Sequence, residues 1–454
     1  MSARPVKVLQ FGQGVFLRGF VDWMLQVLNE RQGLDAGVVI VRPTSRSTAP
    51  LMTAPFHVLL RGLGDDGRPV RQWQRVDCVQ RELDPTTHWD ALLALAAEPA
   101  LRFVVSNTTE AGIAVNDTDR FDDRPPTAFP AKLCRWLHER WRRGGAGVVL
   151  LPCELVEANG PALQRAVHHF AMRWSLEAGF LAWLANECVF CSTLVDRIVS
   201  GAPGDDERAA LEAELGRPDP FMVCAEPFHS WLIEGPASLA DELRLDGAGL
   251  HVELVPDLRP YRQRKVGLLN GAHTLLVAPG LLMGLDSVGD AMRDDTLAGF
   301  LQAALADEIM PALPLPREQL LPFAAATLQR FRNPFVQHRL ASIALNSWPK
   351  FVTRLLPQLL RYRELTGRWP PRLVLGLAAL MHLYRDPALR ASDSPEHLAW
   401  FAEHGAQPWP GLARGWLARR DLWGCDLTEL EAPLTEALAR IARDGMRQAL
   451  TSAA

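Results

Sequence analysis

A mostly apolar run that leads directly into two glycines is the feature that most restricts how this chain can fold. Residues 6–11 form the run, and Gly12-Gln13-Gly14 follows without a gap. A helical pattern over 20–29 and a second apolar run over 38–41 come next. A strand, a tight glycine turn, a helix and a strand form the unit that receives a dinucleotide pyrophosphate at a helix N-terminus. Leu17 replaces the third glycine of the usual fingerprint, so an ordinary β-turn-α is the alternative.

The pattern of apolar residues changes character along the chain. Short apolar runs alternate with helical patterns through the first half, which predicts an α/β domain with a mostly parallel, doubly wound sheet. After a strand-like segment at 251–255, Pro256 and Pro260 interrupt the chain, and nearly every later pattern is helical. We therefore expect a Rossmann-type domain over residues 1–250 and a mostly α-helical domain over 251–454.

Composition excludes several classes of protein. The 454 residues are 48% hydrophobic and 22% charged, with a formal net charge of −4. Interspersed charges argue against nucleic-acid binding, and no apolar run is long enough to span a bilayer. The first residues lack the layout of a signal peptide, so a cytoplasmic protein is expected. Of the seven cysteines, Cys188 and Cys191 form one Cys-x-x-Cys, which is better explained by two reduced, partly buried thiols than by a metal site.

Polar residues that follow predicted strands are candidates for cofactor binding. Asn107 and Thr108 follow an apolar run, and ligands of open α/β sheets bind at the carboxyl ends of strands, although these side chains could equally cap a helix. No acid follows the run 38–41, where NAD-binding domains usually hold the adenosine ribose. Arg42 and Arg46 stand there and could contact the 2′-phosphate of NADP or lie solvated in a loop.

Lys265, Asn270 and His273 bring an amine, an amide and an imidazole into one short segment. In a helix, Asn270 and His273 share a face and Lys265 lies at its edge. Reduction of a carbonyl needs an acid/base group, a donor to the oxygen and a group that orients the substrate. An amphipathic helix with a solvated lysine and a buried histidine is the alternative on spacing alone. Desolvation in a closing cleft would lower the pKa of such a lysine toward neutrality.

Several longer segments resemble one known family. They lie at 10–20, 106–113, 152–160, 192–201, 269–274, 333–338 and 345–350. On these segments the chain resembles the polyol-specific long-chain dehydrogenases, also called the mannitol dehydrogenase superfamily. The resemblance implies an NAD-dependent, metal-independent reductase, with a Rossmann domain, a helical C-terminal domain and an active site in the cleft between them.

The resemblance also implies roles for individual residues. Lys265 is expected to be the general acid/base, Asn270 and Asn159 to hold the reacting oxygen, and His273 to position the substrate. The residues expected to contact the cofactor are Phe11, Gly12, Gly14, Phe16, Asn107, Thr108 and Asp196.

Within the family, the chain is most similar to the branch that interconverts D-tagaturonate and D-altronate. Ser342 and Asn346 stand where the mannitol branch carries Arg and Asp. A sugar acid needs a cation for its carboxylate, and Lys350 is the first candidate. Arg339 is the second, and Arg354 is better explained as a charge on a helix surface.

The resemblance leaves other activities open. Reduction of D-fructuronate to D-mannonate and oxidation of a mannitol-type polyol use the same catalytic set. A non-catalytic NAD-binding sensor is a remote alternative, which the intact set of Lys265, Asn270 and His273 disfavours. The expected partner is a small sugar acid, with NAD as cofactor or NADP in its place, and the expected assembly is a monomer or a small homo-oligomer.

Overall fold

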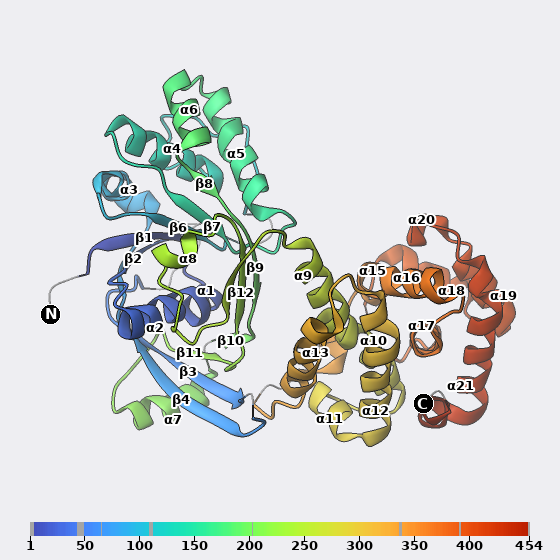
Figure 1. Ribbon diagram of the computed structural model, residues 1–454. Helices are drawn as coiled ribbons and strands as arrows, with labels where there is room; N and C mark the ends of the chain where they lie inside the picture. Colours follow the sequence, from blue (N-terminus) through green and yellow to red (C-terminus); the bar gives the residue numbers. More distant parts are fainter. Residues whose placement is uncertain are drawn as a thin grey trace. The chain divides into compact units, whose positions relative to one another are not determined.

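The computed structural model describes residues 4–42, 50–64, 66–108, 112–201, 203–335, 338–389 and 392–452. The chain divides into two compact units, the first ending at Leu258 and the second beginning at Arg259. Figure 1 colours the first from blue to green and the second from yellow to red. Strand β13 (Val252–Val255) lies beyond the expected boundary at residue 250, but it pairs with β12 (Ser230–Glu234) and so belongs to the first unit.

Unit 1 is built on a six-stranded sheet in which every neighbouring pair is parallel, with the order β5-β2-β1-β6-β7-β8. The strands of this sheet are β1 (Val6–Phe11), β2 (Gly37–Val41), β5 (Val79–Leu83), β6 (Phe103–Ser106), β7 (Val149–Pro152) and β8 (Val189–Phe190). β1 lies between β2 and β6, so the strand order reverses there. Ligands of open α/β sheets bind at such a reversal, outside the carboxyl ends of the strands.

Helices cover both faces of this sheet, as the predicted α/β class requires. Val8 of β1 packs into one core with Phe20 and Met24, whereas Leu9 packs into the other core with Trp136. Successive side chains of a strand point to opposite faces, so a strand buried on both sides is apolar throughout. The helices that line these cores include α2 (Trp23–Gln32), α3 (Pro85–Ala94), α4 (Phe129–Arg142), α5 (Asn159–Arg173) and α6 (Ala178–Asn186).

Two smaller sheets complete unit 1 and were not predicted. One has the order β10-β11-β3-β4 and the other β13-β12-β9. Half of the residues of β4 are polar and half are exposed, so it lacks the continuous apolar run that reveals the central strands. Their elements are β3 (Phe56–Leu63), β4 (Pro69–Val76), β9 (Ser192–Asp196), β10 (Val199–Gly201) and β11 (Val223–Ala225).

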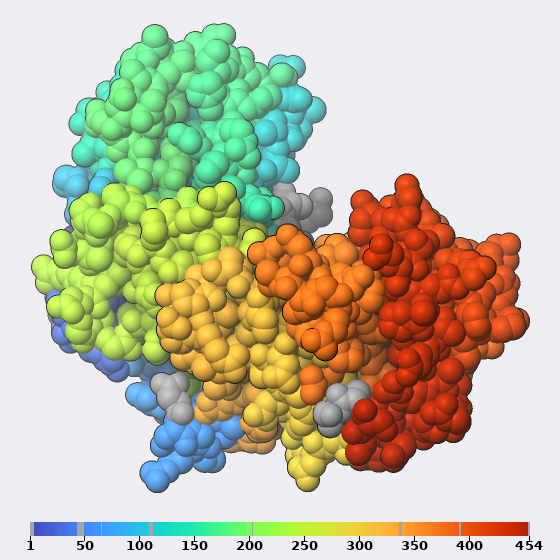
Figure 2. Space-filling view, turned by 45° about the vertical axis from the view of Figure 1, so that its right-hand side comes forward, coloured from blue at the N-terminus to red at the C-terminus, as the bar shows by residue number. Residues whose placement is uncertain are grey.

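Unit 2 is helical, as predicted, and Figure 2 shows its yellow, orange and red segments packed into one body. Its helices include α9 (Arg259–Arg264), α10 (Gly271–Leu282), α11 (Val288–Arg293), α12 (Asp295–Ala304), α13 (Arg317–Phe331), α14 (Leu340–Ile343), α15 (Ser347–Arg354), α16 (Leu356–Thr366), α17 (Pro371–Arg385), α18 (Pro395–His404), α19 (Trp409–Leu417), α20 (Arg420–Trp423) and α21 (Glu431–Thr451). Gly376 lets α17 approach α10 closely, because a Cβ there would lie 2.3 Å from Leu275 Cδ1. Among the described helices, none has the length and apolarity needed to cross a membrane.

An aromatic cluster anchors α15. Trp348 is fully buried, and its ring lies 4.6 Å from that of Trp416 and 5.3 Å from that of Tyr384. Phe401 stacks on Trp348 at 5.6 Å. Burial of several large rings fixes the position of this short helix, and Lys350 and Arg354 follow Trp348 along it.

Candidate active site

The glycine turn at the end of β1 has one glycine that the fold requires and one that it does not. Gly12 has φ of +130°, and a Cβ there would lie 2.7 Å from the carbonyl oxygen of Asn107. Gly14 has φ of −61°, and nothing lies within 4 Å of its Cβ position. Gly12 N donates to Val41 O at 3.0 Å, and Asn107 N donates to Phe11 O at 3.0 Å. The turn is therefore tied to both neighbouring strands at the point where the strand order reverses.

A buried glutamate holds the segment after β6. Glu154 accepts hydrogen bonds from Ser106 Oγ and from both the N and Oγ1 of Thr108, each at 3.0 Å. Asn107 Nδ2 donates to Cys153 O at 3.0 Å. Burial raises the pKa of Glu154 above its ordinary value. Asn107 thus lies next to Gly12, at the carboxyl end of β6 where we expect the cofactor to bind. Hydrogen bonds to Cys153 and Glu154 anchor the side chains of Asn107 and Thr108 just after the end of β7. Thr109 and Glu110 lie outside the described residues.

The other residues expected to contact the cofactor differ in how deeply their side chains are buried. The Phe11 ring is fully buried against Phe129, 5.0 Å away, so only its backbone is available to a ligand. Phe16 is half-buried and stacks on Phe20 at 5.0 Å. Asp196 ends β9 and is 7% exposed.

Asn159 is engaged by the backbone around it. Its Nδ2 lies 2.9 Å from Pro152 O and 3.1 Å from both Glu154 O and Thr193 O, while its Oδ1 accepts from Thr193 N at 2.9 Å. The residue is 1% exposed. These contacts use both N–H groups of the amide and join the end of β7 to β9. The geometry gives Asn159 a supporting position in unit 1.

Arg42 is neither a solvated loop residue nor an uncompensated charge. It is 4% exposed, and its Nε donates to Glu82 Oε1 at 2.6 Å. Its Nη2 donates to Pro50 O at 2.9 Å, and the second oxygen of Glu82 accepts from Met52 N at 2.8 Å. The carboxylate at the end of β5 therefore neutralises the arginine at the end of β2. Arg46 lies outside the described residues.

Lys265, Asn270 and His273 lie on one helical run of unit 2 that contains a π turn. The turn spans Lys265–Asn270, and Gly271 N donates to Val266 O, five residues back. Hydrogen bonds of this spacing bring residues five apart nearly into line, so Lys265 lies closer to the Asn270 face than in an α-helix. All three side chains are half-buried. Single π turns often occur at functional sites.

Cations crowd around His273. Burial lowers its pKa well below the ordinary value, and nearby His338, Arg330, Arg354 and Lys350 lower it further. Its ring stacks on Phe331 at 4.0 Å and meets the His338 ring edge-on at 5.0 Å. His273 is therefore neutral near pH 7, with the side chains of Arg330, Lys350 and Arg354 near it.

Two of these cations come from α15. Lys350 Nζ donates to Ile343 O at 2.8 Å and to Leu345 O, and Arg354 Nη1 donates to Thr274 Oγ1 at 3.3 Å. Burial lowers the pKa of both, and Arg354 also lowers the pKa of Lys350. The structure thus brings Arg354, expected on a helix surface, to α10 beside His273.

Arg339 differs from Lys350 and Arg354 in its exposure and its neighbours. It is exposed and lines a groove with Asp286, Ser287 and Asp290. Arg293 lines the same groove and pairs with Asp290, so the charges there balance and the groove has no excess of positive charge for a substrate carboxylate.

Residues that the sequence did not reveal support each part of the site. Glu82 and Glu154 hold Arg42 and Thr108 through contacts across 40 and 46 residues. Arg330 brings a further charge to His273 from α13. The spacing of a sequence motif could not reveal them, because each acts through a contact between segments far apart in the chain. Among the described residues there is no group of three His, Cys, Asp or Glu that could hold a metal ion.

Comparison with known proteins gives matches over both units. The family model for the mannitol dehydrogenase Rossmann domain matches residues 6–247, and that for the mannitol dehydrogenase C-terminal domain matches residues 257–442. Altronate oxidoreductase of Yersinia enterocolitica is 46% identical over 99% of this chain and 97% of its own length. The Pectobacterium atrosepticum protein of the same name is 45% identical, over 98% and 96%.

Solved structures share the fold. D-sorbitol dehydrogenase in substrate-free form aligns with a TM-score of 0.81, covering 98% of this chain and 95% of that one. Pseudomonas fluorescens mannitol 2-dehydrogenase, solved as a ternary complex with NAD and D-mannitol, aligns with a TM-score of 0.70, covering 99% and 94%. Both are 22% identical to this chain.

The two glycines of the turn provide a matched pair of variants. Gly12→Ala should lower the free energy of unfolding by about 1–3 kcal/mol, because an alanine there is strained and meets Asn107 O. Gly14→Ala should leave stability within about 0.5 kcal/mol, because its Cβ position is open. Any loss of NADH affinity in Gly14→Ala then comes from the ligand approaching that glycine. Thermal unfolding and fluorescence titration with NADH measure both effects, and equal destabilisation by the two substitutions would contradict this geometry.

Proposed function

The chain belongs to the mannitol dehydrogenase family, and from this premise we propose that it interconverts D-tagaturonate and D-altronate with NAD as cofactor. The family and the relatives identify a dehydrogenase that acts on a CH–OH group. The cluster of cations around His273 carries the proposal of a sugar acid as substrate. Lys350 and Arg354 donate to carbonyl and hydroxyl oxygens, so a carboxylate would compensate their charge better than a neutral polyol would.

The residues of unit 1 fit a dinucleotide. The open position at Gly14 leaves room for a pyrophosphate, and the helical run from Val15 presents free N–H groups beside it. The buried pair of Arg42 and Glu82 favours NAD over NADP, because the arginine charge is already matched by a carboxylate. When bound, the nicotinamide supplies or accepts the hydride.

Residues of unit 2 transfer the proton in the proposed reaction. In the reducing direction, charged Lys265 donates a proton to the carbonyl oxygen as it gains negative charge. Asn270 donates a hydrogen bond to the same oxygen. Neutral His273 holds a neighbouring hydroxyl, and its depressed pKa keeps it uncharged through the neutral range. In the oxidising direction, neutral Lys265 takes the proton from the alcohol. A metal is not needed in this scheme, because the lysine and the amide polarise the oxygen.

Asn159 has a different task in this scheme. Its amide is fully used by backbone groups, so we assign it the role of holding the ends of β7 and β9 rather than a contact with the substrate oxygen. Asn270 then stands as the amide donor to the reacting oxygen.

A panel of substrates tests the proposal. The purified protein should oxidise NADH rapidly with D-tagaturonate, slowly with D-fructuronate and D-fructose, and more slowly with NADPH than with NADH. Absorbance of the reduced cofactor measures each rate. Faster turnover of fructuronate would reassign the chain to reduction toward D-mannonate, and faster turnover of fructose would reassign it to a neutral polyol. Binding of NADH without turnover of any of the three would favour the sensor.

Lys265→Ala tests the acid/base role. The substitution should lower kcat by about 10²–10⁴-fold and leave the Kd for NADH unchanged, because the lysine transfers a proton and lies outside unit 1. Arg361→Ala on α16 is the control, since this exposed arginine pairs with Glu364. Steady-state kinetics and an NADH titration provide the measurements. A Lys265→Ala variant with normal kcat would rule out this mechanism.

Removal of the α15 cations tests recognition of the carboxylate. Lys350→Met and Arg354→Met should each raise KM for tagaturonate by about 10–100-fold, the usual effect of losing a hydrogen bond to a charged group. The KM for fructose should change by less than about threefold, and Arg361→Met should affect neither substrate. Equal increases for the acid and the neutral ketose would contradict a role in binding the carboxylate.

A further inference from the structure

A buried acid and a buried amide lie directly behind the glycine turn. Gln10 belongs to β1, and Asp22 ends the π turn Arg18–Asp22 between α1 (Val15–Leu17) and α2; both are 0% exposed. Gln10 Nε2 donates to Gly12 O at 3.1 Å and to Asp22 Oδ2 at 3.3 Å. The two N–H groups of one amide thus link the carboxyl group to the turn.

The amide oxygen of Gln10 and the second carboxyl oxygen of Asp22 lack a hydrogen-bond partner among the residues that the structure describes. These atoms are Gln10 Oε1 and Asp22 Oδ1, and both are buried. Apolar side chains such as Phe20, Val21 and Met24 form the core around them. A buried carboxylate with an unpaired oxygen is costly, and so is a buried amide oxygen that accepts nothing.

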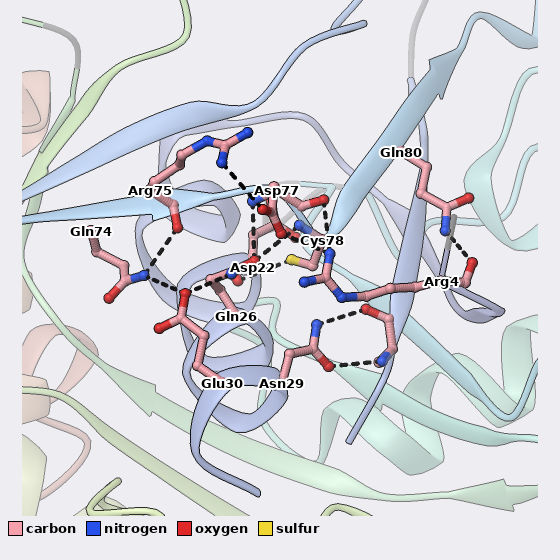
Figure 3. Close-up of polar contacts among 11 residues, drawn as sticks. Arg4, Asp22, Gln26, Asn29, Glu30, Gln74, Arg75, Asp77, Cys78 and Gln80 are labelled. Atoms are coloured by element: carbon pink, nitrogen blue, oxygen red, sulfur yellow. Dashed lines mark hydrogen bonds and ion pairs between the residues drawn. The ribbon is translucent and has the colours of Figure 1, made fainter. Parts of the chain in front are cut away.

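The charged and titratable groups around Asp22 do not remove this cost. Arg18, on the same helical run, favours the ionised form, but its Nη1 donates to Phe221 O. Cys78 donates its thiol to Asp22 O at 3.4 Å, and the ion pair of Arg4 with Asp77 lies beyond Cys78, as Figure 3 shows. Burial outweighs both the hydrogen bond from Gln10 and the charge of Arg18, and it raises the pKa of Asp22 to about 7.

We propose that Asp22 is a protonated positioning residue that fixes the dinucleotide turn through Gln10. In this pair Asp22 Oδ1–H donates to Gln10 Oε1, while Gln10 Nε2–H donates to Asp22 Oδ2. The cyclic acid–amide pair satisfies both unpaired oxygens at once, and the second N–H of Gln10 remains on Gly12 O. The inference rests on the proposed binding of NAD at this turn.

Loss of the proton would release the turn. Two acceptors, Oδ1 and Oε1, would then face each other, and the Gln10 amide would reorient to escape the repulsion. Gly12 O would lose its donor, and the turn would lose the geometry that receives a pyrophosphate. Affinity for the dinucleotide should therefore fall as the pH rises through the neutral range.

Asp22→Asn separates the proton from the shape of the side chain. Its amide N–H can replace the acid O–H and does not titrate in this range. If only the protonated form binds, the Kd for NADH of the natural protein rises about tenfold one pH unit above the pKa of Asp22. Asp22→Asn should remove that rise, and Asp22→Ala should weaken binding at every pH. The same pH dependence in Asp22→Asn and the natural protein would overturn the proposal.

Two readouts without a ligand distinguish this proposal from the proposed function. Below pH 7 the infrared spectrum should contain the C=O stretch of a protonated buried carboxyl that Asp22→Asn lacks. Because the folded pKa of about 7 exceeds the unfolded value of about 4, the natural protein loses stability as the pH rises between them. The Tm of Asp22→Asn relative to the natural protein should therefore increase across that window and level off above it.

The infrared band and the Kd for NADH also show which of the two proposals fails, the binding of NADH or the role of Asp22. A protein that shows the infrared band and does not bind NADH would refute the proposed function alone. A protein that binds NADH with no band and no pH dependence of Kd would refute the role of Asp22 alone. If Asp22→Asn does not fold, the pH titration of Kd and of the infrared band in the natural protein still decides between these outcomes.

Discussion

Mutual repulsion among the cations around His273 is the constraint on which the site in unit 2 depends. Arg330 from α13 and Lys350 and Arg354 from α15 each lower the pKa of this histidine, and Arg354 also lowers the pKa of Lys350. The packing of the unit holds them there. Trp348 fixes α15 within an aromatic cluster, and Gly376 lets α17 press against α10. A fold that maintains such a concentration of charge is suited to binding an anion.

The same constraint would give distinct tasks to the residues of the proposed catalytic segment, Lys265–His273. Burial, together with the nearby charges, keeps His273 neutral, so in the proposed mechanism it would orient a hydroxyl without competing for the proton. The π turn brings Lys265 toward the face that carries Asn270, so acid and hydrogen-bond donor can address one oxygen. A carboxylate at Lys350 and Arg354 would bring its own hydroxyls and carbonyl toward these groups. Recognition of the acid by α15 and transfer of the proton by the run Lys265–His273 would thus take place on neighbouring helices of unit 2.

Unit 1 achieves its precision through buried polar groups rather than through the glycines alone. Gly12 fits only because it has no side chain, but three further contacts determine where the turn lies. Glu154 holds Thr108 beside it, Gln10 holds its carbonyl, and Glu82 neutralises Arg42 at the neighbouring strand. Each of these side chains is almost fully buried, so each interaction is stronger than its equivalent in water.

The sequence predicted the architecture well because that architecture rests on local patterns. The central strands are apolar on both faces, and the helices of unit 2 show clear helical periodicity. The strand β4 was missed because half of its side chains are polar and it has no continuous apolar run. The π turn could not be predicted, since six residues fit α-helical spacing almost as well. Arg354 was expected on the surface because only the tertiary fold brings it to Thr274, 80 residues away. The engagement of Asn159 by Thr193 likewise depends on a pairing of distant segments.

A crystal structure of the protein with NAD and D-altronate would test the proposed binding of the sugar acid most directly. We predict that the carboxylate of altronate lies within hydrogen-bond distance of Lys350 or Arg354, with a hydroxyl at His273 and the reacting oxygen at Lys265 and Asn270. A carboxylate that points to solvent, or that contacts Lys265 while hydroxyls contact the cations of α15, would contradict the account.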